Sequence, residues 1–323
     1  MNTVDAAGEV HITRSLSEAL DRLGVSRTEV HWVARGHARG IAARMRTSES
    51  DHSAAAAIVG VGGGSAMDAA RVAASNANIP AVLVPTSLST DAAFSHVSAH
   101  RVEGSVQYLE TGPAAAVVLD EALLACTDVA LHARGVADVF AILTSSIDCA
   151  LANPTHMARA DEAAALLEPL TRCAEGLASG EMQAVLELAR LMRLKIAIGV
   201  AAGHPFFEEG TEHYLAYLAE GAGATGRLHG DLLWGGIRAC QVLQPWTKAD
   251  RSTYATIRDA VGPFFSPVVT SRSGTERYVR MLAAAPRALA QQGLTNTVLL
   301  SQANSEKRLR KAGLAFAMEG MAD

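Results

Sequence analysis

The chain has 323 residues, of which 49% are hydrophobic and 19% charged, and its formal net charge is −5. This balance is typical of a globular protein, and the length suffices for two domains or for one large α/β unit. A negative net charge without any basic block argues against a nucleic acid partner. We therefore expect a small-molecule substrate.

Cysteine usage and the N-terminus bear on the compartment. The four cysteines lie far apart and form no CxxC pair; they are Cys126, Cys149, Cys173 and Cys240. This spacing favours reduced thiols over a disulfide framework or a zinc–cysteine site. The first residues lack the basic start and apolar core of a secretory signal, and no apolar run approaches the length that crosses a bilayer. We expect a cytoplasmic protein without a membrane partner.

Short apolar runs alternate with turn signals and helical stretches in the N-terminal part. The expected strands are Val30–Ala34, Ala57–Val61, Ala81–Pro85 and Ala115–Leu119. Runs of this length without alternation are typical of strands buried on both faces, and their alternation with helices predicts βα units on a parallel sheet.

The pattern changes near residue 130, after which alanine- and leucine-rich helical patterns replace the strands. The expected helices are Asp161–Leu177, Glu181–Ala201 and Leu228–Leu243. Prolines are expected to mark helix ends or loops in this half; they are Pro205, Pro245, Pro263, Pro267 and Pro286.

The fold class that follows is α/β. A Rossmann-like nucleotide-binding domain is expected over residues 1–125 and an all-helical domain over residues 126–323. Ligands are expected in a cleft between the two domains.

A glycine cluster follows the strand at Ala57–Val61 and consists of Gly62, Gly63 and Gly64. Glycines permit positive φ angles and let a ligand approach the backbone, and Ser65 suits the N-cap of the helix expected over Ser65–Ser75. The free N–H groups of a helix N-terminus attract anions, so the turn is a candidate phosphate site. A tight turn with close helix–strand packing and no ligand remains the alternative.

A second loop, rich in hydroxyl groups, follows the strand Ala81–Pro85. It contains Thr86, Ser87, Ser89 and Thr90, and ends at Asp91. Because ligands bind beyond the carboxyl ends of parallel strands, these groups could contact a cofactor, and Asp91 could orient a substrate hydroxyl. An ordinary turn rich in capping residues is the alternative.

Three segments of the helical half place a potential ligand near the start of a helix. They carry Asp138, then Glu212 with His213, and then His229 with Asp231. Two imidazoles and one carboxylate leave an open position on a divalent ion, as catalytic sites do. Spacing alone does not show that these residues converge, and a satisfied core or surface histidine remains the alternative.

Five motifs occur in a characteristic order: GGGSxxD at residues 62–68, PTSLSTDA at 85–92, GVAD at 135–138, GTEH at 210–213 and LHGD at 228–231. Together they resemble the superfamily of iron-type alcohol dehydrogenases, glycerol dehydrogenases and glycerol-1-phosphate dehydrogenases. Dehydroquinate synthase is more distantly similar. The combination of TEH with LHG is closest to glycerol-1-phosphate dehydrogenase.

The resemblance implies a set of site residues. NAD(P)H would be bound by Gly62, Gly63, Gly64, Ser65, Asp68, Thr86, Ser87 and Thr90. Zn²⁺ or Fe²⁺ would be bound by Asp138, His213 and His229, and Asp91 would contact the substrate. The metal-binding residues and Asp91 would form the catalytic site. We also expect a homo-oligomer, a dimer or larger.

The chain departs from the family in three respects. The glycine turn ends in Ser65, where many members of the family carry Lys. Only one helix fits between Val30–Ala34 and Ala57–Val61, so the sheet is expected to be shortened, and no acidic residue follows the first strand to hold the adenosine ribose. Poor discrimination between NADH and NADPH follows. The four residues after Asp138 are apolar, which predicts a less polar substrate pocket; they are Val139, Phe140, Ala141 and Ile142.

Three functions follow from these expectations. The first is a metal-dependent oxidoreductase that transfers a hydride between NAD(P)H and the carbonyl or hydroxyl group of a small polyol or polyol phosphate. The second is a cyclase or lyase similar to dehydroquinate synthase, with no net redox change. The third is a non-catalytic homologue that has lost cofactor binding.

Overall fold

The computed structural model describes residues 9–13, 57–102, 105–152, 159–204, 207–221, 227–268, 272–291, 297–300 and 305–317. The chain divides into two compact units. The first comprises residues 1–102 and 106–132, and the second residues 103–105 and 133–323. Sequence analysis places this division after residue 125.

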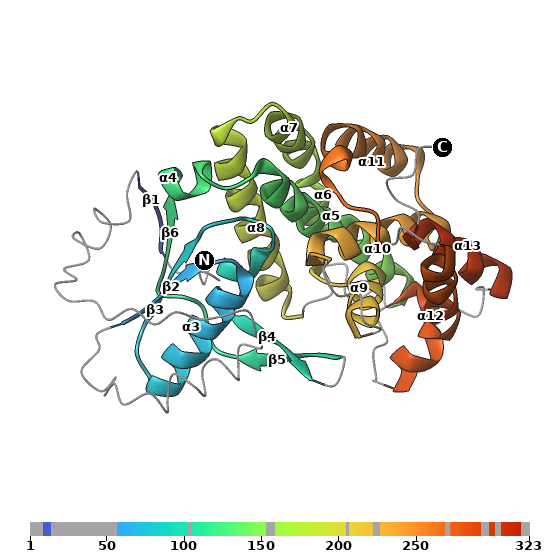
Figure 1. The fold of residues 1–323 in the computed structure, drawn as a ribbon, viewed down its shortest axis with the longest axis horizontal. Helices are drawn as coiled ribbons and strands as arrows, with labels where there is room; N and C mark the ends of the chain where they lie inside the picture. The colour runs from blue at the N-terminus through green and yellow to red at the C-terminus, as the bar shows by residue number, and fades with distance from the viewer. Residues whose placement is uncertain are drawn as a thin grey trace. The chain divides into compact units, whose positions relative to one another are not determined.

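The N-terminal unit is built on a parallel sheet (Figure 1). Its described strands are β1 (Glu9–Thr13), β2 (Ile58–Gly62), β3 (Ala81–Pro85) and β6 (Ala116–Asp120), in the order β1-β6-β3-β2. Every described pairing in this sheet is parallel, and helix α3 (Gly64–Ala77) packs on β2 and β3. The parallel α/β fold predicted from the sequence is confirmed.

Three of the four predicted strands correspond to β2, β3 and β6 within one residue at each end. The strand expected at Val30–Ala34, and with it the shortening of the sheet, lies outside the described residues. Sequence analysis missed β1 and the two-stranded sheet of β4 (Val97–Val102) and β5 (Ser105–Glu110). Two short helices, η2 (Asp91–Ala93) and α4 (Glu121–Ala125), complete the described part of this unit.

The second unit is helical, as predicted. Its elements are α5 (Val129–Ala152, which begins in the first unit), α6 (Ala160–Ala164), α7 (Leu167–Ala178), α8 (Met182–Ala202), α9 (Thr211–Gly221), α10 (His229–Leu243), α11 (Lys248–Val261), η5 (Gly262–Phe264), α12 (Arg272–Gln291), η6 (Val298–Leu300) and α13 (Glu306–Ala317). The single helix expected over Asp161–Leu177 is divided into α6 and α7. Pro286 was expected at a helix end but lies inside α12.

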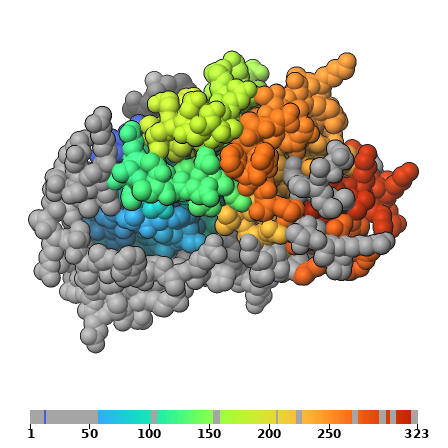
Figure 2. Space-filling view, turned by 45° about the horizontal axis from the view of Figure 1, so that its top comes forward, coloured from blue at the N-terminus to red at the C-terminus, as the bar shows by residue number. Residues whose placement is uncertain are grey.

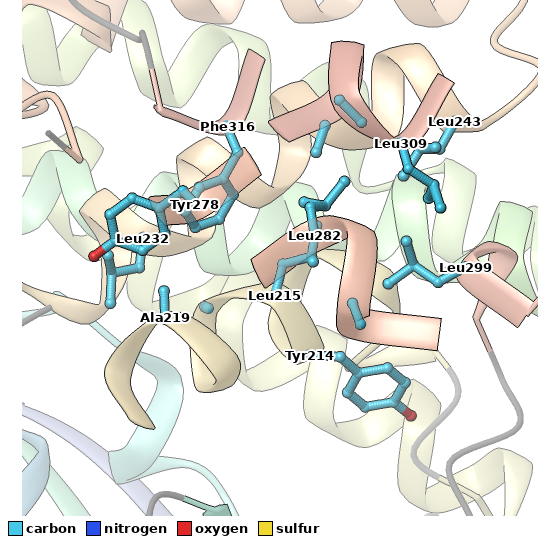
Figure 3. Packing of buried hydrophobic residues seen from close by; sticks show 14 of the residues in the cluster. Tyr214, Leu215, Ala219, Leu232, Leu243, Tyr278, Leu282, Leu299, Leu309 and Phe316 are labelled. Carbon is cyan, nitrogen blue, oxygen red and sulfur yellow. The ribbon is translucent and has the colours of Figure 1, made fainter. Parts of the chain in front are cut away.

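Helices α9, α10, α12 and α13 share one buried apolar core. Figure 3 shows Leu215 of α9, Leu232 of α10, Leu282 of α12 and Phe316 of α13 in this cluster. Helices α7 and α11 also pack on each other, and Figure 2 shows the yellow-green of α7 and α8 beside the orange of α11. Because these helices bury their apolar faces together, the unit needs no sheet.

Helix α5 is the central apolar element. It is long and apolar enough to span a bilayer by length and composition, so the expectation that no run of this length exists was wrong. Within the protein, however, 72% of its most apolar window is buried, as in the core helix of a globular protein. Phe140 of α5 packs against Trp234 of α10 and Tyr254 of α11, with ring centroids 6.3 and 5.9 Å apart.

Helices α9 and α10 approach each other very closely at Gly236. A Cβ atom added to this glycine would lie 2.4 Å from the carbonyl oxygen of Glu212 and 2.8 Å from its Cα. Atoms of a relaxed structure do not come so close, so only glycine permits this separation of the two backbones. The contact fixes the first turn of α9 against the middle of α10.

The same turn of α9 is held from the other side by the buried carboxylate of Asp148 on α5. Its Oδ2 accepts a hydrogen bond from the backbone N of Thr211 at 2.6 Å, and its Oδ1 accepts from Gln244 Nε2 at 2.9 Å and from the N of Val298 at 3.1 Å. One carboxylate therefore joins α5, α9, the end of α10 and η6. Burial raises the pKa of Asp148 to about 7, the charge of Glu212 adds to this effect, and the hydrogen bonds from Thr211 and Gln244 oppose it.

We expect Gly236→Ala to destabilise the protein by about 1–3 kcal/mol, because the added methyl group must push backbone atoms of α9 away. Chemical denaturation measures the change. Gly262→Ala is the matched control, since a Cβ there would meet only Arg258 Cγ at 3.4 Å. Equal stability of the two variants would show that α9 yields without strain.

Asp148 predicts a pH dependence of stability. Its pKa in the folded chain exceeds the value of about 3.9 in an unfolded chain, so folding takes up a proton and stability falls as pH rises from about 4 to about 7. Asp148→Asn removes a hydrogen-bond acceptor and is expected to lower stability at every pH, but with a flatter profile. Urea denaturation between about pH 4.5 and 6.5 checks this. Asp259 is exposed, so Asp259→Asn should keep the wild-type change of unfolding free energy with pH and serves as the control. If Asp148→Asn keeps it as well, Asp148 is not the group that causes the pH dependence.

Candidate functional site

The glycine turn joins β2 to α3. Helix α3 begins at Gly64 with Gly63 as its N-cap, and no side chain caps it, so the prediction that Ser65 is the N-cap was wrong. Gly62 has a φ of 147°, a conformation that side chains rarely adopt. The glycine at this position is therefore required by the turn itself.

Gly63 is different, because packing does not require it. Among the described residues, a Cβ added there would meet only Ser87 Oγ, at 3.9 Å, whereas one added to Gly64 would lie 3.0 Å from Thr90 Oγ1. The backbone at the start of α3 is thus open at Gly63 and lies beside two of the predicted hydroxyl groups. Thr86 belongs to the same loop, where its N donates to the carbonyl oxygen of Gly62 at 2.9 Å. An N-terminal helix turn with room beside it suits an anionic group.

Asp68 and Asp91, also predicted as site residues, occupy this unit. Asp68 is buried and forms an ion pair with Arg71 at 2.9 Å, while its Oδ1 also accepts from the N of Ala99 at 3.3 Å. The carboxylate of Asp68 thus joins α3 to β4. Asp91 begins η2, and its carbonyl oxygen accepts a hydrogen bond from the N of Phe94. Burial lowers the pKa of the Arg71 guanidinium, and the charges of Asp68 and Asp91 oppose that shift.

The three predicted metal ligands come together within the helical unit. Asp138 lies on α5, His213 in the first turn of α9 and His229 at the first residue of α10. His213 Nε2 is 3.6 Å from Asp138 Oδ1, and the ring centroids of His213 and His229 are 5.6 Å apart. In the sequence, His213 and His229 lie 75 and 91 residues after Asp138. Their proximity is produced by the packing of α5, α9 and α10.

Lys195 of α8 lies in the same place and was not singled out from the sequence. Its Nζ is 3.0 Å from Asp138 Oδ1, and both side chains are almost fully buried. Burial by itself would raise the pKa of the Asp138 carboxyl, but Lys195, His213 and His229 outweigh it and hold that pKa far below its ordinary value. A signal was present, because Lys195 shares a helix face with the buried Leu191 and Met192.

Each of the two histidines also contacts a glutamate. His213 Nδ1 donates to Glu212 Oε1 at 2.9 Å, and His229 Nδ1 donates to Glu220 Oε1 at 3.3 Å. Burial by itself would lower the pKa of His213, but the carboxylates of Asp138 and Glu212 outweigh it and raise that pKa to about 10. The ring of Tyr217 stacks on His229, with centroids 5.9 Å apart.

Two other features of the motifs have structural roles. Asp231 Oδ1 accepts from Arg134 Nε at 3.0 Å and from the N of Ser266 at 2.9 Å, and its Oδ2 accepts from the N of Leu228 at 3.3 Å. Asp231 therefore fixes the start of α10. The apolar residues after Asp138 are buried among other apolar side chains, as Phe140 shows. They form core and do not indicate how polar a substrate pocket is.

The donor types at this site suit a divalent cation. One carboxylate and two imidazoles are ligands that both zinc and iron accept. Within the described part of the chain, no group of three or more His, Cys, Asp or Glu side chains is arranged so that it could hold a metal ion as it stands. The three residues are adjacent, and Lys195 occupies one oxygen of Asp138. Their donor types fit a metal ion, but coordination would require the side chains to move from the positions they have here.

Comparison with known sequences supports the resemblance that the five motifs predicted. Residues 3–127 match the profile of the iron-containing alcohol dehydrogenase family. The chain is 29% identical over 220 residues to the glycerol-1-phosphate dehydrogenase [NAD(P)+] of Thermoplasma volcanium, which covers 65% of this chain and 61% of that protein. It is 29% identical over 276 residues to the enzyme of the same name from Thermofilum pendens, covering 81% of this chain and 76% of that protein.

Solved structures extend the similarity to the whole fold. A probable glycerol dehydrogenase from Sinorhizobium meliloti superimposes with a TM-score of 0.68 at 20% identity, covering 98% of this chain and 92% of that chain. Glycerol dehydrogenase from Schizosaccharomyces pombe superimposes with a TM-score of 0.66 at 18% identity, covering 97% and 83%. The resemblance that the motifs predicted is therefore confirmed: this chain is related in sequence to the NAD(P)-linked alcohol and polyol dehydrogenases of the iron-containing alcohol dehydrogenase superfamily, and it has their fold.

Proposed function

We propose that the protein is a metal-dependent oxidoreductase that transfers a hydride between NAD(P)H and the carbonyl or hydroxyl group of a small polyol or polyol phosphate, as glycerol-1-phosphate dehydrogenase does. The observation that carries the proposal is the proximity of Asp138, His213 and His229 on three different helices. The similarity to named dehydrogenases supports it.

The chain's own residues have distinct roles in this proposal. Asp138, His213 and His229 would hold Zn²⁺ or Fe²⁺, and the open turn at Gly63 would receive the pyrophosphate of the cofactor. When bound, the ion would polarise the substrate oxygen and the nicotinamide would carry the hydride. Asp91 remains the group proposed to contact a substrate hydroxyl. The buried ammonium of Lys195 favours a substrate rich in oxygen over a simple alkyl alcohol.

The same ammonium keeps a second candidate open, a cyclase or lyase similar to dehydroquinate synthase. A buried cation beside a metal-binding carboxylate also suits an anionic substrate that undergoes proton transfer. The two candidates differ in their redox balance. Net consumption of NADH or NADPH with a polyol ketone supports the oxidoreductase, whereas conversion of a substrate without net change in the cofactor supports the alternative.

We expect the wild-type protein to bind one divalent ion per chain and to bind NADH or NADPH with similar affinity. His213→Ala and His229→Ala should each abolish bound metal and oxidoreductase activity, because each removes one ligand nitrogen of the site. Elemental analysis measures the amount of bound metal, and calorimetric titration measures the affinity for NADH and NADPH. Gly63→Val should block the cofactor but keep the fold, since only Ser87 Oγ lies near the added side chain.

His52→Ala is a suitable control for the histidine variants, because His52 stands in none of the five motifs. Stoichiometric metal in His213→Ala or His229→Ala would refute the ligand assignment. Failure of the metal-loaded wild type to bind any nicotinamide cofactor would refute the oxidoreductase proposal.

Lys195 predicts an unusual response to metal. Because Lys195 is the ammonium partner of the buried Asp138, Lys195→Met removes this ion pair and should destabilise the metal-free protein by about 3–5 kcal/mol. A divalent ion no longer meets the repulsion of the ammonium in this variant. We therefore expect Zn²⁺ to raise the melting temperature of Lys195→Met by more than it raises that of the wild type. The surface variant Lys248→Met should behave as the wild type, and an equal or smaller Zn²⁺ shift in Lys195→Met would contradict the prediction.

A further inference from the structure

We propose that Glu212 and Glu220 are positioning residues that orient His213 and His229 toward a metal ion. Each glutamate accepts a hydrogen bond from Nδ1 of one imidazole, so Nε2 becomes the nitrogen available to the ion. The inference rests on the proposed function, since it concerns the ion that Asp138, His213 and His229 would hold.

The ring of His213 lies between two carboxylates. Its Nδ1 is 2.9 Å from Glu212 Oε1, and its Nε2 is 3.6 Å from Asp138 Oδ1. A carboxylate can only accept, so the proton between His213 and Glu212 belongs to Nδ1. Glu212 is fully buried, and its Oε1 also accepts from the N of Gly210 at 2.7 Å. This arrangement fixes the rotation of the ring and keeps a proton on Nδ1, so Nε2 is the nitrogen that would lose its proton when an ion binds.

The second oxygen of Glu212 lies in an unfavourable environment. Glu212 Oε2 is buried and has no hydrogen-bond partner among the described residues. It lies near another carboxylate, because a Cβ added to Gly210 would be 3.1 Å from Glu212 Oε2 and 2.8 Å from Asp148 Oδ2. An unsatisfied buried oxygen near a second acid is destabilising. The first turn of α9 already has Asp148 as a partner for Thr211, so Glu212 adds the bond from the N of Gly210 and the bond from His213.

His229 has an equivalent partner in Glu220. Its Nδ1 is 3.3 Å from Glu220 Oε1, and the ring of Tyr217 stacks on its face. Glu212, His213, Tyr217 and Glu220 all belong to α9, from its first turn to its last. One helix therefore supplies one imidazole, the partners of both imidazoles, and the ring that holds the second in its plane.

This pattern is the one that metal-bound histidines use. A histidine that donates its other ring N–H to a carboxylate is held in one orientation and becomes a more basic ligand. Loss of such a partner lowers metal affinity by about 10- to 100-fold. Because two separate histidines each have a glutamate at Nδ1, an effect of this size is expected at each of them.

The experiment uses the full chain at one fixed pH. Zn²⁺ affinity is measured by competition with a chelating dye, and the visible absorption of bound Co²⁺ reports ligand geometry. We expect Glu220→Leu and Glu212→Leu each to weaken Zn²⁺ binding by about 10- to 100-fold and to alter the Co²⁺ spectrum. Glu220→Gln and Glu212→Gln keep an acceptor oxygen and should restore most of the affinity. Glu187→Leu, which removes a carboxylate paired with Arg190 on α8, is the control and should bind as the wild type does.

The outcomes separate the two proposals. Wild-type affinity and an unchanged Co²⁺ spectrum in both leucine variants would overturn the positioning role and leave the proposed function standing. A wild-type protein that binds no divalent ion would overturn both. If Glu212→Leu does not fold, Glu220→Leu decides, since Glu220 is partly exposed at the end of α9. Equal loss in the leucine and glutamine variants of Glu220 would assign its effect to charge and overturn the hydrogen-bond role.

Discussion

The position of the first turn of α9 is the constraint on which the helical unit depends. Gly236 lets α10 touch the backbone of that turn, and Asp148 binds its first N–H group from α5. Since both contacts are buried and involve backbone atoms, the turn has almost no freedom to move. His213 is part of this turn, so its position relative to Asp138 follows from contacts that do not involve either side chain.

The structure gives the glycine-containing motifs two different meanings. In GTEH and LHGD, the glycines and the acidic residues organise helix starts, as Asp231 does for α10. In the turn after β2, Gly62 has the positive φ that the backbone requires, but a Cβ added to Gly63 would meet only Ser87 Oγ among the described residues. Gly63, whose lack of a side chain is not required by packing, therefore indicates a ligand site better than the presence of three glycines does.

Much of this could be predicted from the sequence, for identifiable reasons. The strands β2, β3 and β6 are short apolar runs, of which β3 and β6 are fully buried, and α8 and α10 have long helical patterns, so both kinds of element carry a strong signal. The β4–β5 pair was missed because its polar residues hide the strand pattern. Pro286 was misplaced because α12 accommodates a proline in its interior. The order of the motifs located Asp138, His213 and His229, but only the packing shows that they meet.

The groups around those three residues were the part that sequence could not supply. Lys195, Glu212 and Glu220 come from different positions on α8 and α9, and their roles depend on which atoms they face. Together they account for the environment of the buried Asp138 carboxylate and of the two imidazoles. Lys195 balances the charge of Asp138, Glu212 contacts the ring nitrogen of His213 opposite the one that faces Asp138, and Glu220 contacts Nδ1 of His229. In the proposed function, a divalent ion would take the place of the Lys195 ammonium beside Asp138 and would require the Nε2 atoms of the imidazoles to be free of protons.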